Sequence, residues 1–441
     1  MSTFWCEHAM LPDGHRRSVR LLVYEGRITQ VLPAAPAEPG DTVLRGVVLP
    51  GFANGHSHTF HRALRGRTHD DGGNFWTWRN AMYAVTHRLD PKTFHALAKA
   101  VFAEMVLAGY TAVGEFHYVH HAPGGRRHED PNLMGRALIS AAREAGIRLT
   151  LLDTAYLAGG LTADGHLPLD EVQQRFSDGT VSAWAERVAD LSGDDTTRIG
   201  VAVHSVRAVP RADLAAVGDV AASRGMPLHV HLSEQPGENL ACDGFYGCSP
   251  TELLASEGLL TPATTVVHAT HLSEKDIRLL GDAGTTACFC PTTERDLADG
   301  IGPARHLHDA GVSISLGSDQ HAVIDPFEEV RGVEMNERLD SLERGRFSPR
   351  DLLAMGSLFG YRSLGWQDGG LIATGHLADF VAVRLDSPRT AGTGPEGVLY
   401  AATSADVCDV VVGGSHVVKD GRHRVGDVGL LLRDAIVEVR G

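Results

Sequence analysis

Eight short apolar runs recur along the chain, and nearly all of them end in polar residues. They span residues 47–58, 110–118, 147–156, 198–206, 227–234, 264–271, 285–292 and 313–320. Near-continuous runs of Val, Ile, Leu and Ala are typical of parallel strands that are covered on both faces. Helical patterns separate them, for example at 91–109, 211–225 and 273–284, and each of these closes near a glycine. The alternation predicts an α/β fold, a (β/α)8 TIM-type barrel with its chemistry at the carboxyl ends of the strands.

The flanks of the chain have a different pattern. Residues 19–48 and 371–421 show β-type alternation without intervening helices. We therefore expect one small β-sandwich domain built from both terminal segments, residues 1–48 and 369–441, around a barrel of residues 49–368. A length of 441 residues suits a barrel with a smaller appended domain.

Composition limits the partners of the chain. Forty Lys and Arg against 55 Asp and Glu give a formal charge of −15, with no basic tract. Such a chain is a poor candidate for binding nucleic acid or an anionic membrane, so we expect a small-molecule substrate. The start of the chain does not resemble a signal peptide, no run reaches membrane-spanning length, and the six cysteines are scattered. We expect a cytoplasmic protein with reduced thiols, assembled as a homodimer, although no interface can be read from the sequence.

His56 and His58 end the first apolar run. Residues two apart in a strand point to the same side, so both imidazoles can hold one metal ion. Alone, this spacing is as well explained by coincidence. Its position, directly after the segment 50–55 and at the expected barrel mouth, favours the metal site.

Further candidate ligands end other runs. His229, His231 and Glu234 end the fifth run, His268 the sixth and Asp319 the eighth. One of the two histidines of the fifth run can be a third ligand, and Glu234 can lie beside the water to be activated. Three histidines and an aspartate at one barrel mouth form a site for a divalent metal of borderline softness.

Several motifs resemble a known superfamily. PGFANGHSH (50–58), HVHLSE (229–234), VVHATH (266–271) and LGSDQHA (316–322) resemble the metal-site signatures of the amidohydrolases, in their mononuclear deaminase branch. GRITQV, GHLADFVAV and VVVGGSHVVKDG resemble the flanking β domain of that superfamily, so the similarity spans nearly the whole chain. Binuclear members use a carboxylated lysine of the fourth strand. The fourth run here reads VAVHSVRAV, so the resemblance implies one divalent metal ion, expected to be zinc.

More specific strings resemble the formimidoylglutamate deiminase family, which hydrolyses N-formimidoyl-L-glutamate to N-formyl-L-glutamate and ammonia in histidine degradation. These strings are FHRALRGRT, FWTWRNAMY, GEFHYVHH, VHSVRAV and HLSEQ. By this resemblance the metal ligands are His56, His58, His231 and Asp319, the catalytic residues are Glu234, His268 and Asp319, and the substrate-binding residues are His61, Arg79, Tyr118, His204 and Arg207. One position departs from the family pattern, because His61 stands where glutamine is more common.

The expected chemistry is consistent with these roles. A formimidoyl carbon is an amidine-type electrophile, and its attack needs an activated water. Asp319 is expected to take the water proton, Glu234 to protonate the leaving nitrogen, and His268 to orient the nucleophile. Two substrate carboxylates call for guanidinium partners such as Arg79 and Arg207.

Two other functions compete with this one. A related enzyme could deaminate a heterocycle such as guanine, cytosine or a triazine from the same strand-end site. A flat neutral ring would need aromatic stacking and amides more than arginines. A catalytically inactive barrel with a structural role is disfavoured, because none of the expected metal ligands is missing.

Overall fold

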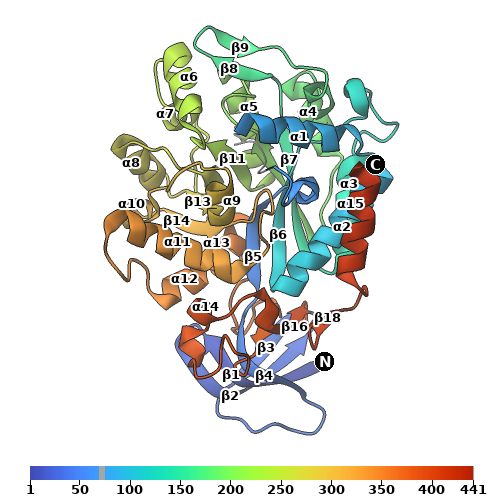
Figure 1. The fold of residues 1–441 in the computed structure, drawn as a ribbon, viewed down its shortest axis with the longest axis vertical. Coiled ribbons are helices and arrows are strands. Elements are labelled where there is room, and N and C mark those ends of the chain that lie inside the picture. Colours follow the sequence, from blue (N-terminus) through green and yellow to red (C-terminus); the bar gives the residue numbers. More distant parts are fainter. Residues whose placement is uncertain (69–74, 441) are drawn as a thin grey trace.

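The computed structural model describes residues 1–68 and 75–440, and Figure 1 shows a barrel above a smaller β domain. The barrel sheet has eight parallel strands in the order β14-β13-β12-β11-β10-β7-β6-β5. Their bounds are β5 (Phe52–Ser57), β6 (Tyr110–His117), β7 (Arg148–Ala155), β10 (Thr197–Val203), β11 (Leu228–Leu232), β12 (Thr264–His268), β13 (Thr286–Phe289) and β14 (Ser313–Leu316). All eight predicted runs are strands of this sheet, which confirms the TIM-type barrel.

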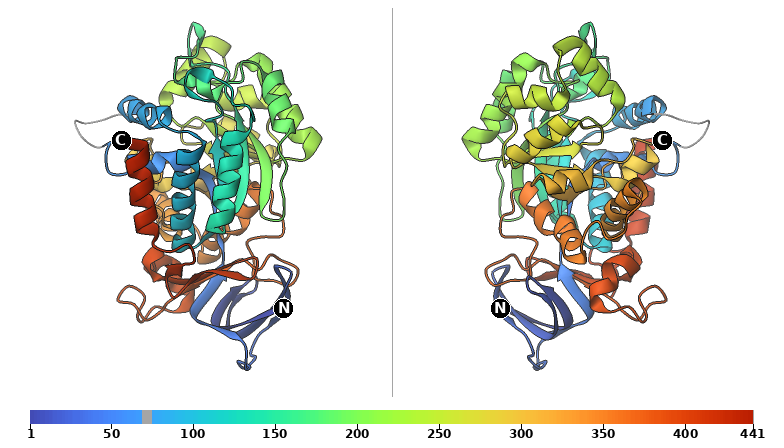
Figure 2. Two further views of the ribbon diagram at one scale, coloured as in Figure 1. Left: turned by 90° about the vertical axis from the view of Figure 1, so that its right-hand side faces the viewer. Right: turned by 90° about the vertical axis from the view of Figure 1, so that its left-hand side faces the viewer.

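Helices surround the barrel strands, as the two side views show (Figure 2). They are α1 (Phe75–His87), α2 (Pro91–Ala108), α3 (Leu133–Ala145), α4 (Val181–Ala189), α5 (Arg211–Arg224), α6 (Pro236–Tyr246), α7 (Pro250–Ser256), α8 (Glu274–Asp282), α9 (Pro291–Asp296), α10 (Ala304–Asp309), α11 (Pro326–Ser341), α12 (Pro349–Gly356) and α13 (Leu358–Ser363). Among the described residues no helix combines the length and the apolar character needed to cross a membrane.

The predicted helix at 91–109 illustrates how sequence signals set the element bounds. Asp90 caps α2 by accepting from the Lys92 and Thr93 amides, and Pro91 occupies the first turn. Gly109 ends the helix in the left-handed conformation, at φ 107°. Strand β6 begins at the next residue, so one glycine turns the chain from the outer layer back into the barrel.

The barrel closes between its first and last strands. Ser57 and Asp319 form a parallel bridge there, the Asp319 amide donates to His56 O at 3.0 Å, and the His58 amide donates to Asp319 O at 3.1 Å. Close approach requires Gly317, because a Cβ at that position would lie 2.8 Å from His56 Cβ. The seam thus joins the segments that carry three of the predicted ligands.

Both ends of the chain build one further sheet, in the order β18-β17-β16-β15-β4-β1-β2-β3. Its strands are β1 (Ser2–Leu11), β2 (Gly14–Tyr24), β3 (Arg27–Leu32), β4 (Thr42–Pro50), β15 (Phe380–Val383), β16 (Val407–Val412), β17 (Ser415–Lys419) and β18 (Arg422–His423). The small β domain from both termini is confirmed. The sequence led us to expect a sandwich of two sheets, but all eight strands are hydrogen-bonded into a single sheet.

Helix α14 (Val398–Ala401) lies between β15 and β16 of this sheet. After β18 the chain returns to the barrel, where the last helix, α15 (Val428–Arg440), packs along α2 on the outside (Figure 1). Buried Val428, Leu432 and Val439 face inward from α15 and belong to the barrel's hydrophobic core. The C-terminal segment therefore contributes to both bodies.

A buried ion pair connects the barrel to the terminal sheet. Arg148, at the start of β7, donates to both carboxylate oxygens of Asp379, at 2.6 and 3.1 Å. The same carboxylate accepts from Tyr361 Oη at 2.8 Å and from the Gly413 amide at 2.7 Å. Both charged side chains are at most 5% exposed. With every lone pair engaged, this arrangement offsets the desolvation of the two charges.

We expect Asp379→Asn to lower the free energy of unfolding by about 3–5 kcal/mol, because it leaves the Arg148 guanidinium buried without its counter-charge. Denaturant unfolding measures the effect. The matched control is Asp434→Asn, which removes the exposed pair with Arg433 and should cost less than about 1 kcal/mol. Equal stability of the two variants would contradict this role for the buried pair.

Candidate metal centre

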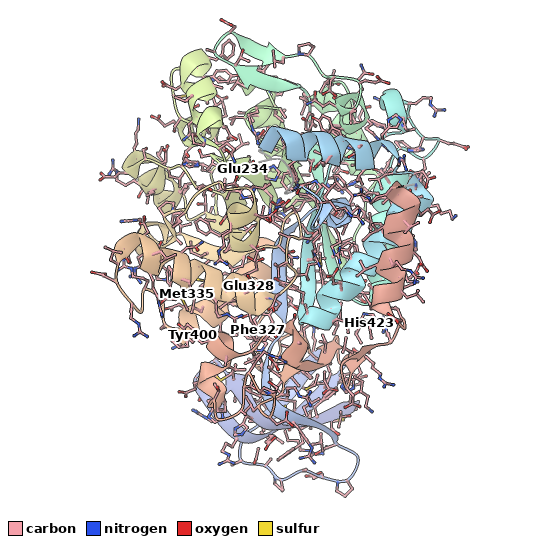
Figure 3. All side chains as sticks on the ribbon, in the orientation of Figure 1. Glu234, Phe327, Glu328, Met335, Tyr400 and His423 are labelled. Carbon is pink, nitrogen blue, oxygen red and sulfur yellow. The ribbon has the colours of Figure 1, made fainter. Side chains whose placement is uncertain are left out.

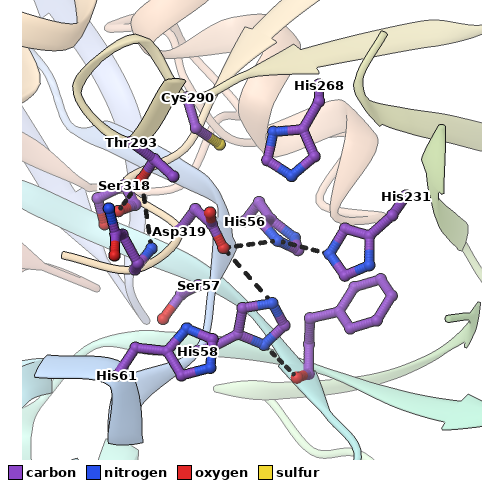
Figure 4. Close-up of polar contacts among 12 residues, drawn as sticks. His56, Ser57, His58, His61, His231, His268, Cys290, Thr293, Ser318 and Asp319 are labelled. Carbon is purple, nitrogen blue, oxygen red and sulfur yellow. Dashed lines mark hydrogen bonds and ion pairs between the residues drawn. The ribbon is translucent and has the colours of Figure 1, made fainter. Parts of the chain in front are cut away.

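Four of the predicted ligands meet at the carboxyl end of the barrel (Figure 4). His56 and His58 come from the end of β5, His231 from β11 and Asp319 from the residues after β14. His56 Nε2 lies 3.2 Å from Asp319 Oδ1 and 3.1 Å from His231 Nε2, and His58 Nε2 lies 3.5 Å from Asp319 Oδ1. All four residues are more than nine-tenths buried.

Hydrogen bonds set which ring nitrogen faces the cluster. His58 Nδ1 donates to the Phe116 carbonyl at 2.9 Å, and His231 Nδ1 donates to the His204 carbonyl at 2.9 Å. In each neutral ring the Nε2 lone pair then points into the cluster. Burial lowers the pKa of His56 to about 3, with the His58 ring adding to the effect and Asp319 opposing it, so this imidazole is also neutral.

Neutral imidazoles and one carboxylate are the donors that zinc and related divalent ions take in proteins. Burial raises the pKa of Asp319, but its hydrogen bond with His56 and the neighbouring imidazoles hold that pKa far below its usual range. The carboxylate is therefore ionised at neutral pH. The four residues fit a divalent cation, and His56, His58, His231 and Asp319 would hold it.

The backbone around the cluster is strained. Asp319, His268 and Ser233 adopt positive φ values of 39°, 69° and 50°, although none of them is glycine. Such conformations are costly for residues with a Cβ and persist where the surroundings fix them. His268 ends β12, Ser233 directly follows β11, and Asp319 lies three residues after β14, so all three positions are where the chain turns out of a barrel strand.

His268 and Glu234 lie beside the ligand cluster. His268 Nε2 is 3.8 Å from Glu234 Oε1, and its Nδ1 is 3.6 Å from Glu294 Oε1. Burial lowers the pKa of His268, but the Glu234 and Glu294 carboxylates outweigh it and raise the pKa to about 10. Glu234 lies at the end of the barrel that is remote from the terminal sheet (Figure 3). A cationic imidazole and a carboxylate therefore lie next to any group bound at the cluster.

The sequence analysis missed Glu294 and Asp299. Glu294 is in the first turn of α9, and its Oε1 accepts from the Cys290 amide at 2.8 Å, which directs it toward His268. Asp299 approaches Glu234 and His268, and burial among these carboxylates raises its pKa to about 8. The seventh run closes with Cys290, Pro291 and Thr292, so its pattern gave no carboxylate or imidazole to follow. Pro291, a helix-starting residue near the end of that run, was the available signal.

A cavity of about 370 Å³ opens beside the cluster. Its lining includes His58, His231, Glu234, His268 and Asp319, and four predicted substrate-binding residues, His61, Tyr118, His204 and Arg207. Side chains that were not predicted complete it: Trp78, Met82 and Tyr83 of α1, Tyr156, Leu161, Leu167 and Phe176. Arg79 belongs to α1, but its side chain lies outside the described residues.

His61, which departs from the family pattern, lines the cavity next to the candidate ligand His58. Its Nε2 is 3.1 Å from Tyr118 Oη, and its ring centroid is 4.6 Å from that of His58. The ring is 2% exposed, and its Nδ1 has no hydrogen-bond partner among the described residues. Burial lowers the pKa of His61 well below its usual value, with the neighbouring His58 adding to the effect. A neutral imidazole thus faces the space next to the cluster.

Arg207 supplies positive charge to the cavity. Its guanidinium lies 3.3 Å from Glu234 Oε2 and 3.0 Å from Glu238 Oε2, and its side chain is 22% exposed. Burial disfavours the charged guanidinium, but the two carboxylates outweigh it and raise the pKa of Arg207. The side chain remains charged and partly open to the cavity, where an anionic group can reach it.

A second group of histidines is structural. His117 and His120 lie near Asp153, close enough to suggest a metal site. However, both Asp153 oxygens accept from Arg187 at 2.8 Å, and one also accepts from Trp184 at 3.0 Å. A carboxylate saturated by a guanidinium is a poor ligand for a cation. This network explains much of the GEFHYVHH string without a second metal.

The fold and the strand-end cluster define a metal-dependent hydrolase barrel. The family model described as "Amidohydrolase family" matches residues 47–422. The chain is 35% identical to formimidoylglutamate deiminase of Pseudomonas aeruginosa over 96% of both chains. It is 32% identical to 8-oxoguanine deaminase of the same species, over 91% of this chain and 90% of that one. A crystal structure of an amidohydrolase from Brucella melitensis superposes with a TM-score of 0.92 at 31% identity and covers 100% of both chains.

The chain belongs to the amidohydrolase family. Its membership agrees with the resemblance read from the strand-end motifs. By name, one of these relatives is a deiminase of formimidoylglutamate and the other a deaminase of 8-oxoguanine. The family is therefore established, whereas the substrate has to be inferred from the cavity.

Asp319→Asn should weaken metal binding by at least about tenfold, because it replaces the only carboxylate among the four ligands by a neutral amide. Competition with a chromophoric chelator measures the affinity without any assay of activity. The control is His95→Gln, a histidine on the outer helix α2 that pairs with Glu144. Unchanged affinity in Asp319→Asn would remove this residue from the ligand set.

Proposed function

We propose that this protein hydrolyses N-formimidoyl-L-glutamate to N-formyl-L-glutamate and ammonia, as a cytoplasmic enzyme of histidine degradation. The observation that carries the proposal is the position of Arg207. Its charged guanidinium lines the cavity beside the candidate metal ligands, although the protein as a whole is acidic. A substrate carboxylate can pair with it in a charge-assisted, bidentate manner. Similarity to the Pseudomonas formimidoylglutamate deiminase over nearly the whole chain supports the same substrate.

The residues around the cluster have complementary tasks in this reaction. A divalent cation held there supplies Lewis acidity that makes water nucleophilic near neutral pH. Asp319 directs Oδ1 toward the imidazoles and can accept the proton of the attacking water. Glu234 delivers a proton to the leaving nitrogen, and His268 donates a hydrogen bond to the oxygen that attacks the formimidoyl carbon. Both protons of the water end on this nitrogen, its bond to the formimidoyl carbon breaks to release ammonia, and the water oxygen becomes the carbonyl of the formyl product.

Substrate binding is assigned to the cavity wall. Arg207 and, on α1, Arg79 are proposed to bind the two carboxylates, while Tyr118 and His204 contact the chain between them. His61, hydrogen-bonded to Tyr118, is proposed to contact the amidine end. If His61 only contacts substrate, His61→Gln should retain activity.

We further propose one ion per chain, zinc in the cell. The fourth strand β10 carries no lysine that could bridge a second ion, which supports a mononuclear centre. The protein is proposed to work as a homodimer, without nucleic acid or membrane partners. Metal analysis that finds two tightly bound ions per active chain would contradict the mononuclear assignment.

A second candidate function is deamination of a heterocycle. The aromatic wall of Trp78, Tyr83, Tyr118, Tyr156 and Phe176 favours it, because a flat ring could stack there. The similarity to 8-oxoguanine deaminase points the same way. Arg207 argues against it, because a neutral purine or triazine offers no carboxylate that could pair with the open side of this guanidinium.

The substrate assignment is tested by ammonia release from the zinc-loaded protein. We expect turnover of N-formimidoyl-L-glutamate and little activity on its neutral diamide, because each arginine–carboxylate pair that loses a partner costs about 3–5 kcal/mol. Guanine, 8-oxoguanine and cytosine are assayed in parallel. Efficient turnover of one of these bases, with none of the formimidoyl amino acid, would favour the second candidate.

Glu234→Gln should lower kcat by about two to four orders of magnitude while the fold and the bound metal are retained, because an amide cannot deliver a proton. Steady-state kinetics and metal analysis of the same preparation measure both quantities. Glu274→Gln, at a 94% exposed side chain of α8, is the control. Near-normal kcat in Glu234→Gln would exclude this residue as the proton donor.

A further inference from the structure

Three segments that are distant in sequence form the wall of the substrate cavity. Helix α1 contributes Trp78, Met82 and Tyr83, the segment after β7 contributes Tyr156 and Gly159–Thr162, and the 3-10 helix η4 (Gln173–Phe176) contributes Phe176. In Figure 1, α1 crosses the mouth of the barrel as an outer helix. Hydrogen bonds between these segments are needed to hold their side chains in fixed positions around a small ligand.

The side chain of Gln173 makes such a connection. Its amide nitrogen lies 3.0 Å from Tyr83 Oη, 3.1 Å from Tyr156 Oη and 3.0 Å from Gly159 O. Its carbonyl oxygen accepts from the Asp170 amide at 3.0 Å. The amide has two hydrogens for three acceptors, so its donor capacity is fully used. One buried amide, 2% exposed, thereby joins all three wall segments.

Arg175, two residues further along η4, connects the end of α1 to the barrel. Its guanidinium donates to Thr86 O, to Leu89 O at 2.8 Å and, through Nε, to His121 O at 2.9 Å. Thr86 is in the last turn of α1, where carbonyls lack partners within the helix and favour a positive charge. Burial lowers the pKa of Arg175 to about 10, opposed by Asp90, so the charge is kept at neutral pH.

Neither Gln173 nor Arg175 lines the cavity, so neither contacts a ligand in it. We propose that these two residues are positioning residues that hold α1 across the barrel mouth and thereby set the affinity for substrate. The identity of that substrate rests on the function proposed above. The four candidate ligands, Glu234 and His268 lie in or after barrel strands and not on α1, so loosening α1 should weaken substrate binding and leave the chemical step intact.

The test compares Gln173→Met with Gln174→Met. Both replace a glutamine of η4 by a side chain of similar length, but Gln174 is exposed. In Gln173→Met we expect KM for N-formimidoyl-L-glutamate to rise about tenfold, the equivalent of one or two lost neutral hydrogen bonds, with kcat within about threefold of wild type. Bound metal should be unchanged. Gln174→Met should match the wild type in every measurement.

Hydrogen exchange supplies a readout that needs no substrate. Amides in peptides covering residues 81–89 should exchange faster in Gln173→Met than in wild type or Gln174→Met, because the contact to Tyr83 is lost. If Gln173→Met does not fold, Gln173→Asn keeps a polar amide that is one methylene too short to reach Tyr83, Tyr156 and Gly159 together. It should show the same two effects.

Two results would overturn the proposal: exchange of α1 that does not differ between the Gln173 and Gln174 variants, or a fall in kcat with KM unchanged. Failure of the proposed function is recognised separately. In that case the wild-type protein does not hydrolyse N-formimidoyl-L-glutamate, while the difference in exchange between the two variants is still measured.

Discussion

The seam between β5 and β14 is the contact on which the centre depends. Closing the barrel brings His56 and His58 against Asp319 through backbone hydrogen bonds at 3.0 and 3.1 Å. A glycine at 317 allows the approach. Because three of the four candidate ligands lie at the ends of the two strands that complete the ring, closure of the barrel also brings most of the donor set together. A cation bound by these side chains would in turn stabilise the closed barrel, since it binds the folded state alone.

Polar side chains behind the ligands reinforce this seam. Glu115 Oε2 accepts from Ser57 Oγ at 2.6 Å, and its Oε1 accepts from the Thr59 amide and hydroxyl, both at 2.8 Å. Across the seam, the Asn54 side-chain amide of β5 donates to Ser318 Oγ at 2.7 Å and accepts from the Ser318 amide at 3.0 Å. Burial raises the pKa of Glu115 to about 7, against the hydrogen bonds it accepts from Ser57 and Thr59. These groups lock the strand that carries both histidines without touching the cavity.

The features that could be predicted from the sequence are those set by hydrophobic periodicity or by residues close together in the chain. Strand positions, the helix bounds marked by Pro91 and Gly109, and the small β domain followed from periodicity and capping residues, and the strand-end cluster followed from the rule that barrel ligands end strands. The far wall of the cavity did not, because Tyr83, Tyr156 and Phe176 come together only through tertiary contacts. Glu294 was missed for a related reason, since it points back from a helix rather than forward from a strand.

The pairing of β4 with β15 constrains the order in which the molecule can be made. Val47 to Pro50 pair with Phe380 to Val383, more than three hundred residues later in the chain. During synthesis, β4 can associate with β1 early, but its other edge stays unpaired until nearly the whole barrel has been translated. An unpaired edge rich in valine and leucine invites association with other chains. In the nascent protein, this edge of β4 is therefore open to such association until its partner strand emerges from the ribosome.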